Sequence, residues 1–543
     1  MKFSYNWLRE LTTGLDAEPA ALGQLITMKT AECDGVEPHA PWLSRVVAAK
    51  VLSVEPIEGS THNQKAVVDA GEYGQRTVVC GAPNCRAGMI TAYVPPGTKL
   101  GSVEIRKATI EGVESDGMLA SGQELGISRD HSGILELDDE VFDLLPDYII
   151  EIDNKSLTHR PDLWGHFGMA REVAAIAGAR LVDPVDMSLI PEGRAPVRIE
   201  IPDFALCPRY SALVFENVTV QPSPLWLQHQ LEAVGLNPIN NIVDVTNFVM
   251  AELGQPMHAF DAEKLQGDTI WARPSREGER ILALNGEWYD LKPSNIVIAD
   301  ESGPIAIGGV IGGGPSAISE FTTRIVLESA NFQASSIRRT STSLKLRTDA
   351  SMRFEKAQDP LNTLRGLARA ITLLEEVSPG IRVVGGLADA WRETPPPPPI
   401  TVPVAWLQQK LGRAIDGREV AGILESIEFG VTETEPGVLS VTVPSWRATK
   451  DISIKDDLVE EVGRMVGYAS ITPRPPFVAD SPVAVAYQHV REAPPLPSSL
   501  NAAIPESLDR VVLHSLAKDR ETRYQNAAEF RADLENVRSR RAV

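Results

Sequence analysis

Residues 240–261, NNIVDVTNFVMAELGQPMHAFD, place polar side chains on a stretch that is otherwise suited to burial. The spacing Gly254-Gln255-Pro256 predicts the end of a helix and places His258 in the turn that follows. A histidine on a short turn behind a helix end can reach a cavity, so this stretch is the first candidate for a functional site. The apolar face predicted for the helix consists of Ile242, Val245, Phe248, Val249 and Leu253.

The gross composition limits the class of protein. A chain of 543 residues is too long for a single hydrophobic core, so we expect several domains. No apolar run approaches the ~20 residues that span a bilayer, and the start MKFSYNWLREL lacks the pattern of a signal peptide, so we expect a soluble, cytoplasmic protein. The net charge of −21 argues against a surface that is basic overall, so any RNA contact depends on a local patch or a partner subunit.

The four cysteines are too scattered for a disulfide framework or a zinc site, and we expect reduced, mostly buried thiols at Cys33, Cys80, Cys85 and Cys207.

The pattern changes along the chain and predicts an α+β multidomain fold. Short β-rich runs divided by turn signals, in residues 42–150, are typical of a small Greek-key barrel. A polyproline run at 395–399 predicts a stiff spacer between two further domains. The predicted units are an α/β segment at 1–41, the barrel at 42–150, a helix-and-strand domain at 151–394, the spacer, a small α/β domain at 400–474 and a helical tail at 475–543.

Polar groups for acid-base chemistry occur in the third of these units. His258 and Glu328 are candidates for an acid-base or water-positioning pair, with Asn247 as a hydrogen-bonding partner. The glycines of IAIGGVIGGG would let a ligand approach backbone N–H groups, although the run matches no phosphate-loop pattern and a tight turn is its simpler meaning. The alternative is a structural histidine and a glutamate in a surface strand. The candidate ligand-binding glycines are Gly308, Gly309 and Gly312.

A second group of charged residues lies in DISIKDDLVEEVGRMVGY. Carboxylates this close repel one another unless a cation lies among them, and hard oxygen ligands suit Mg²⁺. The alternative is a solvated acidic first turn that the helix dipole favours. The candidate magnesium ligands are Asp451, Asp457, Glu460 and Glu461.

Several long motifs together resemble the beta subunit of bacterial phenylalanyl-tRNA synthetase, over residues 1 to about 474. These are GQPMHAFD, IAIGGVIGG, LESANF, RTDASMRFEK and PSWRATKDISIKDDLVEEVGRMVGY, while VVCGAPNCRAGM and EGVESDGMLASGQELGI resemble the inserted tRNA-binding OB-fold domain of that subunit. The resemblance implies an OB-fold barrel, a B3/B4 editing module and a winged-helix-like B5 domain.

The function implied by this resemblance is shared between two subunits. An alpha subunit, in an α₂β₂ heterotetramer, would attach phenylalanine to tRNA(Phe) with ATP, and this chain would hydrolyse tyrosine wrongly attached to the tRNA. The editing pocket would contain His258, Glu328 and Asn247, with Gly308 where alanine is usual. The resemblance also favours Mg²⁺ as a cofactor at the four carboxylates.

RNA contacts are a weaker expectation. The resemblance points to Lys65, Arg106 and Lys107 of the OB-fold domain, although the stretch Ser60-Thr61-His62-Asn63-Gln64-Lys65 departs from the family pattern. Ordinary charges on a barrel surface are the alternative.

The tail departs from the family. Residues after about 474 resemble the last helices of the C-lobe of a bacterial serine/threonine protein kinase, and the sequence lacks a glycine-rich loop and an intact catalytic loop, so no kinase activity is expected. We expect a truncated subunit fused to this fragment, in which Arg523 lacks its native partner. A free-standing tRNA-binding and editing protein and a non-functional chimera are the alternatives.

Overall fold

The computed structural model describes residues 1–138, 142–467, 494–500, 504–519 and 522–540. The chain forms two compact units, Met1–Met465 and Val466–Val543. Across the described residues, no helix is both long enough and apolar enough to cross a membrane. The junction expected near residues 474–476 lies outside the described residues.

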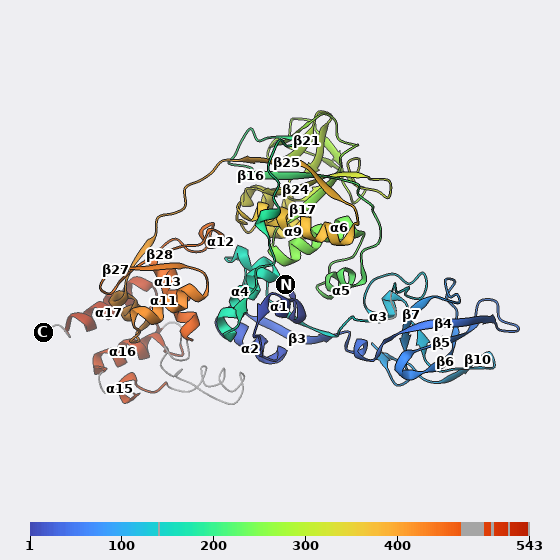
Figure 1. Cartoon of the computed structure of the whole chain (residues 1–543). Helices are drawn as coiled ribbons and strands as arrows, with labels where there is room; N and C mark the ends of the chain where they lie inside the picture. Colours follow the sequence, from blue (N-terminus) through green and yellow to red (C-terminus); the bar gives the residue numbers. More distant parts are fainter. Residues whose placement is uncertain (139–141, 468–493, 501–503, 520–521, 541–543) are drawn as a thin grey trace. The chain divides into compact units, whose positions relative to one another are not determined.

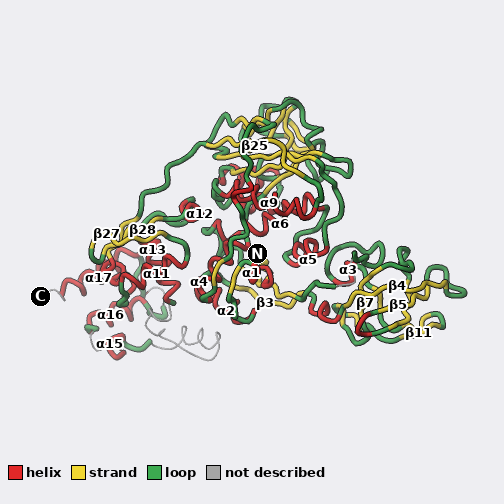
Figure 2. Tube along the Cα trace, in the orientation of Figure 1, coloured by secondary structure: helices red, strands yellow, loops and turns green. Residues whose placement is uncertain are grey.

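A five-stranded antiparallel sheet of order β12-β7-β4-β5-β6 forms the barrel-like domain. Its strands (yellow in Figure 2) enclose apolar side chains that include Val51, Val68, Val78 and Tyr93. The strands and the short helix of this domain are β4 (Val47–Pro56), β5 (Gln64–Asp69), β6 (Gln75–Cys80), β7 (Ile90–Val94), β10 (Ala108–Ile110), β11 (Val113–Ser115), β12 (Met118–Leu119) and α3 (Gly122–Leu125). The β-rich barrel expected here is confirmed.

A four-stranded antiparallel sheet of order β17-β24-β16-β25 carries the first predicted site. Helix α9 packs on β24 and β16, and α6 packs on α9 and β17, so two helices cover one face of the sheet (Figure 1). The bounds are β16 (Arg209–Glu216), α6 (Asn241–Leu253), β17 (Met257–Asp261), β24 (Arg324–Asn331), α9 (Asn362–Val377) and β25 (Arg382–Trp391).

Helix α6 is the helix predicted from residues 240–261. The side chain of Asn240 caps its first turn by accepting from the N–H groups of Ile242 and Val243 at 3.1 and 3.0 Å. Gly254 ends the helix with a left-handed φ of 71°, which glycine adopts without steric cost. All five residues of the predicted apolar face are buried, so that prediction is confirmed.

A second sheet completes this domain, in the order β15-β18-β21-β22-β23. Its inner face shares a core with the outer face of the first sheet, where Tyr210, Phe260 and Phe332 are buried with Ile298 and Ile307. The elements are β15 (Arg198–Glu200), β18 (Thr269–Pro274), β21 (Ile296–Asp300), β22 (Gly303–Ile307), β23 (Ile311–Gly312), α7 (Ala334–Leu344) and α8 (Asp349–Phe354).

The N-terminal segment and residues 400–465 complete the first unit. A three-stranded sheet of order β1-β13-β3 lies with α1, α2 and α4, and a second one of order β26-β28-β27 lies with α10, α11 and α13. The bounds are β1 (Lys2–Ser4), α1 (Tyr5–Glu10), α2 (Pro19–Lys29), β3 (Cys33–His39), β13 (Asp147–Ile152), α4 (His166–Ala177), α5 (Leu225–Ala233), β26 (Ile400–Pro403), α10 (Val404–Leu411), α11 (Gly417–Ser426), β27 (Gly430–Glu435), β28 (Val438–Thr442), α12 (Ser445–Ala448) and α13 (Lys455–Val466).

The described part of the tail contains the helices α15 (Pro497–Leu500), α16 (Glu506–Ser515) and α17 (Ala527–Arg540). Helices α16 and α17 pack on each other, in the part of the chain where a helical tail is expected. The guanidinium of Arg523 donates to the backbone carbonyl oxygens of Ala517 and Lys518, which are not the glutamate partner that the kinase resemblance implies for it.

Candidate functional site

His258 and Glu328 face each other across two neighbouring strands. His258 lies in β17 and pairs in register with Glu328 of β24. Residues directly opposite each other in an antiparallel pair project to the same face, with Cβ atoms roughly 4.5–5.5 Å apart. Both side chains line one cavity of about 90 Å³. The prediction that His258 lies in a turn is wrong, because a strand holds it, and the paired strand fixes its position more firmly than a turn would.

Burial shifts the acid-base chemistry of both groups. Desolvation lowers the pKa of His258 from 6.5 to about 4 and raises the pKa of Glu328 from 4.5 to about 7. Glu328 is 7% exposed, so the surface-strand alternative does not hold for it. The ring nitrogen Nε2 of His258 is buried and has no hydrogen-bond partner among the described residues. The cavity therefore holds a neutral imidazole with an unused nitrogen beside a carboxyl group that titrates near neutrality.

Tyr210 is a member of this site that sequence reasoning missed. Its hydroxyl, on the adjacent strand β16, donates to Oε2 of Glu328 at 2.6 Å and fixes the carboxyl group. Tyr210 is fully buried and lies 118 positions from Glu328 in sequence. Only the register of β16 with β24 brings the two together, and no local pattern in the sequence indicates it.

The glycine turn between β22 and β23 forms one wall of the cavity, and all three predicted glycines line it. A Cβ atom on Gly312 would lie 2.4 Å from Cε1 of His258, so only glycine fits beside the ring. A Cβ atom on Gly308 would instead meet Ile296 and Phe332, away from His258. The N–H of Gly308 donates to the Ile296 carbonyl oxygen at 2.9 Å, so the backbone already uses this N–H group.

Asn247 is not part of this cavity. It lies half-buried on α6 and is absent from the residues that line the site, so it is not brought together with His258 and Glu328. The remaining walls are apolar, including Met257, Ile298 and Phe354. An apolar cavity with two or three convergent polar groups is the usual form of a small-molecule site.

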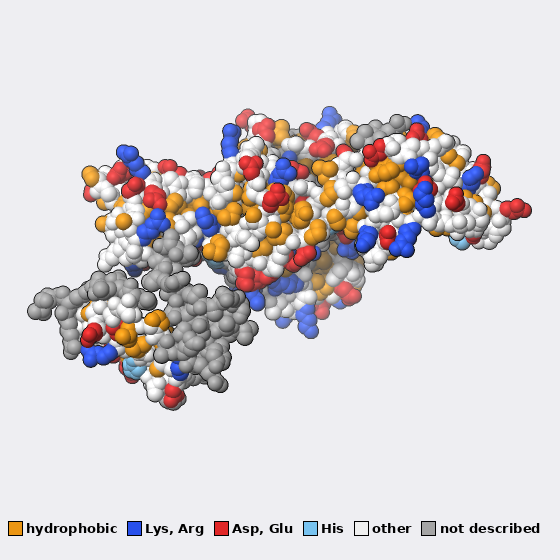
Figure 3. Space-filling model, turned by 90° about the horizontal axis from the view of Figure 1, so that it is seen from below, with side chains coloured by type: hydrophobic (Ala, Val, Ile, Leu, Met, Phe, Trp, Pro, Cys, Tyr) orange, Lys and Arg blue, Asp and Glu red, His pale blue; other side chains and the backbone are white. Residues whose placement is uncertain are grey.

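A second hollow, of about 380 Å³, lies on the barrel domain. Lys65 and Lys107 both line it, together with Arg76, which sequence reasoning missed. Asp116 lies 2.9 Å from Nζ of Lys107 and 3.5 Å from Nε of Arg76, so an acid partly neutralises this basic group. Arg106 is not among the lining residues and pairs with Glu104 at 2.6 Å. Lys and Arg are similarly interspersed with Asp and Glu on the face drawn in Figure 3.

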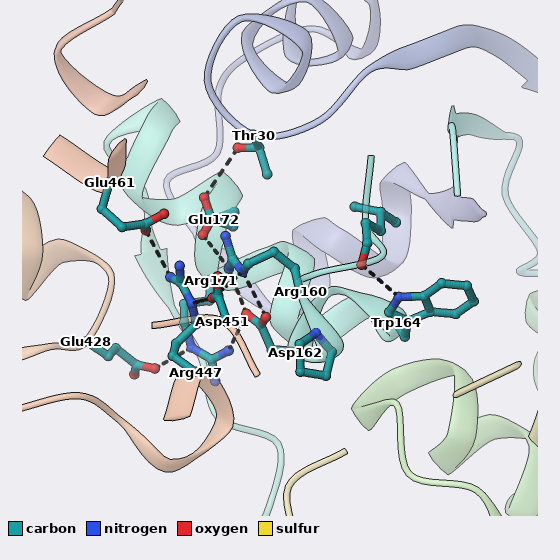
Figure 4. Close-up of polar contacts among 12 residues, drawn as sticks. Thr30, Arg160, Asp162, Trp164, Arg171, Glu172, Glu428, Arg447, Asp451 and Glu461 are labelled. Atoms are coloured by element: carbon teal, nitrogen blue, oxygen red, sulfur yellow. Dashed lines mark hydrogen bonds and ion pairs between the residues drawn. The ribbon is translucent and has the colours of Figure 1, made fainter. Parts of the chain in front are cut away.

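The four predicted magnesium ligands are not gathered around one point. Asp451 and Glu461 both accept from the Arg447 guanidinium, which also appears in Figure 4. Asp457 caps α13 by accepting from the N–H groups of Ser453 and Ile454, and Glu460 is exposed. Among the residues that the structure describes, no three His, Cys, Asp or Glu side chains lie together so as to hold a metal ion.

Comparison with known families identifies three domains. Residues 46–142 match the putative tRNA binding domain, residues 206–379 match the B3/4 domain, and residues 400–468 match the tRNA synthetase B5 domain. The His258–Glu328 cavity therefore lies within the B3/4 match and the Lys65 hollow within the tRNA-binding match.

Known relatives agree with these matches. The phenylalanine–tRNA ligase beta subunit of Solibacter usitatus is 67% identical over 485 residues, which cover 89% of this chain and 62% of the relative. The Gloeobacter violaceus beta subunit is 39% identical over 492 residues, again with 62% of its length covered. A solved N-terminal fragment of the Pyrococcus horikoshii beta subunit aligns with 61% of this chain and 90% of that fragment, at 15% identity and a TM-score of 0.32. Over about 485 of its 543 residues, the chain is similar to phenylalanine–tRNA ligase beta subunits, and three of its regions match the putative tRNA binding, B3/4 and tRNA synthetase B5 domains.

Proposed function

We propose that the chain acts as the beta subunit of phenylalanine–tRNA ligase and hydrolyses mischarged Tyr-tRNA at the His258–Glu328 cavity. The single observation that carries the proposal is the register pairing of these two residues on the wall of one cavity. The cavity volume of about 90 Å³ is well above the ~10–15 Å³ that one water needs.

In this proposal the two groups orient a water molecule, and no covalent intermediate forms. The carboxylate form of Glu328 accepts a proton from the water, and the water oxygen attacks the carbonyl carbon of the ester that joins tyrosine to the tRNA. The ester bond breaks, and the proton passes to the leaving ribose oxygen, releasing tyrosine and free tRNA. A neutral His258 can accept one hydrogen bond from the same water through Nε2, for which the described residues provide no other partner. A pKa of Glu328 near 7 leaves both of its forms available at neutral pH.

Hydrolysis of Tyr-tRNA(Phe) by the purified chain tests this proposal. We expect Glu328→Gln and His258→Ala each to slow tyrosine release by roughly 100-fold or more, the range typical of a lost general acid-base group. Glu287→Gln is the matched control, because Glu287 is an exposed glutamate of the same domain. Undiminished hydrolysis in both cavity variants, with the domain still folded, would overturn the assignment.

The partners follow from the same proposal. ATP-dependent attachment of phenylalanine belongs to an alpha subunit, with which the chain forms a heterotetramer in the cytoplasm. Mg²⁺ accompanies the ATP phosphates there, as is common where phosphates are bound. The tRNA contacts this chain through Lys65 and Lys107, with Arg76 beside them. The chain spans about 62% of the length of the relatives it matches, so co-purification with the alpha subunit is the direct test.

A free-standing editing protein is the second candidate. One observation favours it: the lining of the cavity comes from a single stretch, residues 256–354, so no residue of another subunit is needed to build it. Tyr-tRNA hydrolysis by a chain that does not bind the alpha subunit would support this candidate.

We also propose that residues 475–543 are a fragment related to a protein kinase C-lobe, without kinase activity. The packing of helices α16 and α17 on each other supports this proposal. The other proposed domain borders are those expected from the sequence, with the B5 domain at 400–474. Resequencing across residues 470–480 in one DNA clone would test whether the two parts belong to one gene.

A further inference from the structure

A network of eight buried charged side chains joins residues 160–172 to residues 447–464. Each of these side chains is 8% exposed or less. One contributing part of the chain is the turn and helix at Arg160–Glu172. The other consists of α12, α13 and the segment between them in the B5-matched region. The members are four arginines, Arg160, Arg171, Arg447 and Arg464, and four carboxylates, Asp162, Glu172, Asp451 and Glu461. Figure 4 labels all of these members except Arg464.

Both oxygens of Glu461 are occupied by guanidinium groups. Oε2 accepts from Nη2 of Arg464 at 2.6 Å and from Nη1 of Arg447 at 2.9 Å, and Oε1 accepts from Nε of Arg464 at 2.9 Å. Arg464 then reaches across to Glu172, where Nη1 and Nη2 donate at 2.7 and 3.0 Å. Glu461 is therefore the middle of a bridge between the two parts of the chain.

Asp451 is held in the same way. Its Oδ2 accepts from Nε of Arg447 and lies 3.5 Å from Nε of Arg160. Arg160 is itself fixed by Asp162, through bonds of 2.9 and 2.7 Å, and by Glu172 at 2.7 Å. The carboxylate thus faces two arginines that other acids hold in place.

The buried charges of this network balance, since four arginines face four buried carboxylates, and the half-exposed Glu428 adds a fifth carboxylate at Arg171. A divalent cation at Asp451 and Glu461 would add two positive charges in a buried place beside four guanidinium groups, and repulsion there is weakly screened. Within the part of the chain that the structure describes, the buried Nη2 of Arg447 has no hydrogen-bond partner, and this nitrogen is a donor. This unsatisfied donor requires a hydrogen-bond acceptor, and a metal ion cannot act as one.

We propose that Asp451 and Glu461 do not bind Mg²⁺ and instead anchor a metal-independent ion-pair network that fastens the B5-matched region to residues 160–172. The carboxylates that the family resemblance assigns to magnesium then have a structural role, as partners of Arg447 and Arg464. This inference does not depend on the proposed editing activity.

Magnesium chloride added to the full chain tests the first half of the proposal. Thermal unfolding of the wild-type chain in magnesium chloride and in excess EDTA, at equal ionic strength, should give the same melting temperature within error. Calorimetric titration with magnesium chloride should show either no binding or binding that persists unchanged in Asp451→Asn and Glu461→Gln. Magnesium binding that disappears in those two variants, or a melt that EDTA lowers in the wild type alone, would overturn the proposal.

Substitution of the arginines tests the second half. Arg464→Gln leaves Glu172 and Glu461 buried with fewer partners, and should lower the melting temperature by at least about 5 °C in EDTA and in magnesium alike. Arg464→Lys keeps the charge and should recover part of that loss. Asp456→Asn is the matched control on the same helix, because its pair with Lys410 is half-exposed, and it should leave the melt unchanged. An Arg464→Gln chain as stable as the wild type would contradict the network.

Discussion

Glu328→Gln is expected to change how the stability of the B3/4-matched domain depends on pH. Burial raises the pKa of the Glu328 carboxyl group from 4.5 to about 7, so the folded domain disfavours its ionised form. Below pH 4.5 the Glu328 carboxyl group is protonated in both the folded and the unfolded chain, so its burial as an ion does not lower the stability there. As pH rises from 4.5 to 7, the unfolded chain ionises this group more readily than the folded one does, and the domain loses stability. The difference between these two pKa values corresponds to about 3 kcal/mol of stability, and the domain has lost all of it above pH 7.

The glutamine variant cannot ionise, so its stability relative to the wild type should rise by about 3 kcal/mol between pH 4 and pH 8. Hydrogen exchange of the backbone amides in β16, β17 and β24 measures the free energy of opening of this domain alone, once the rates are corrected for the intrinsic effect of pH. A global melt is less suitable because the chain has several domains. Glu287→Gln, at an exposed site, should follow the wild type at every pH. A difference between wild type and Glu328→Gln that stays constant from pH 4 to pH 8 would refute the assigned pKa.

Further predictions concern three other places in the molecule. Gly312→Ala should abolish deacylation while the domain stays folded by circular dichroism, because its Cβ atom would lie 2.4 Å from Cε1 of His258; unchanged activity would mean that the ring is free to move. Lys65→Ala combined with Lys107→Ala should weaken tRNA binding and lower the slope of log affinity against log salt by about 2, measured by filter binding; an unchanged slope would remove this hollow from the interface. Burial lowers the pKa of His166 to about 4, so the folded chain is most stable with respect to this group above pH 6.5 and loses about 3 kcal/mol of stability as pH falls to 4. Hydrogen exchange in α4 should show that loss in the wild type and not in His166→Gln.

Local sequence was sufficient for the helices. The α6 helix could be predicted because its apolar spacing, the Asn240 cap and the Gly254 stop all lie within 15 residues and agree. His258 was assigned to a turn because its strand is five residues long and gains its stability from β24, which lies about 70 positions further along the chain. Strand register over such a separation leaves no periodic signal near either partner.

The charged groups show the same limit more clearly. The sequence predicted a metal site at the acids near Asp457 because spacing along a helix reveals the neighbouring acids and not the arginines that pair with them from distant parts of the chain. The arginine that joins Glu461 to the rest of the network makes its second contact with Glu172, 292 positions away. Tyr210 beside Glu328 is a similar case, since β16 and β24 are brought together only by the fold.

Tyrosine release from Tyr-tRNA(Phe) by the wild-type chain, compared with release by a chain carrying both His258→Ala and Glu328→Gln, tests the proposed editing cavity most directly. We expect rapid release by the wild type and only the uncatalysed rate with the double variant, when hydrogen exchange shows the domain intact in both. Equal rates in the two chains would contradict the claim that this cavity performs the hydrolysis.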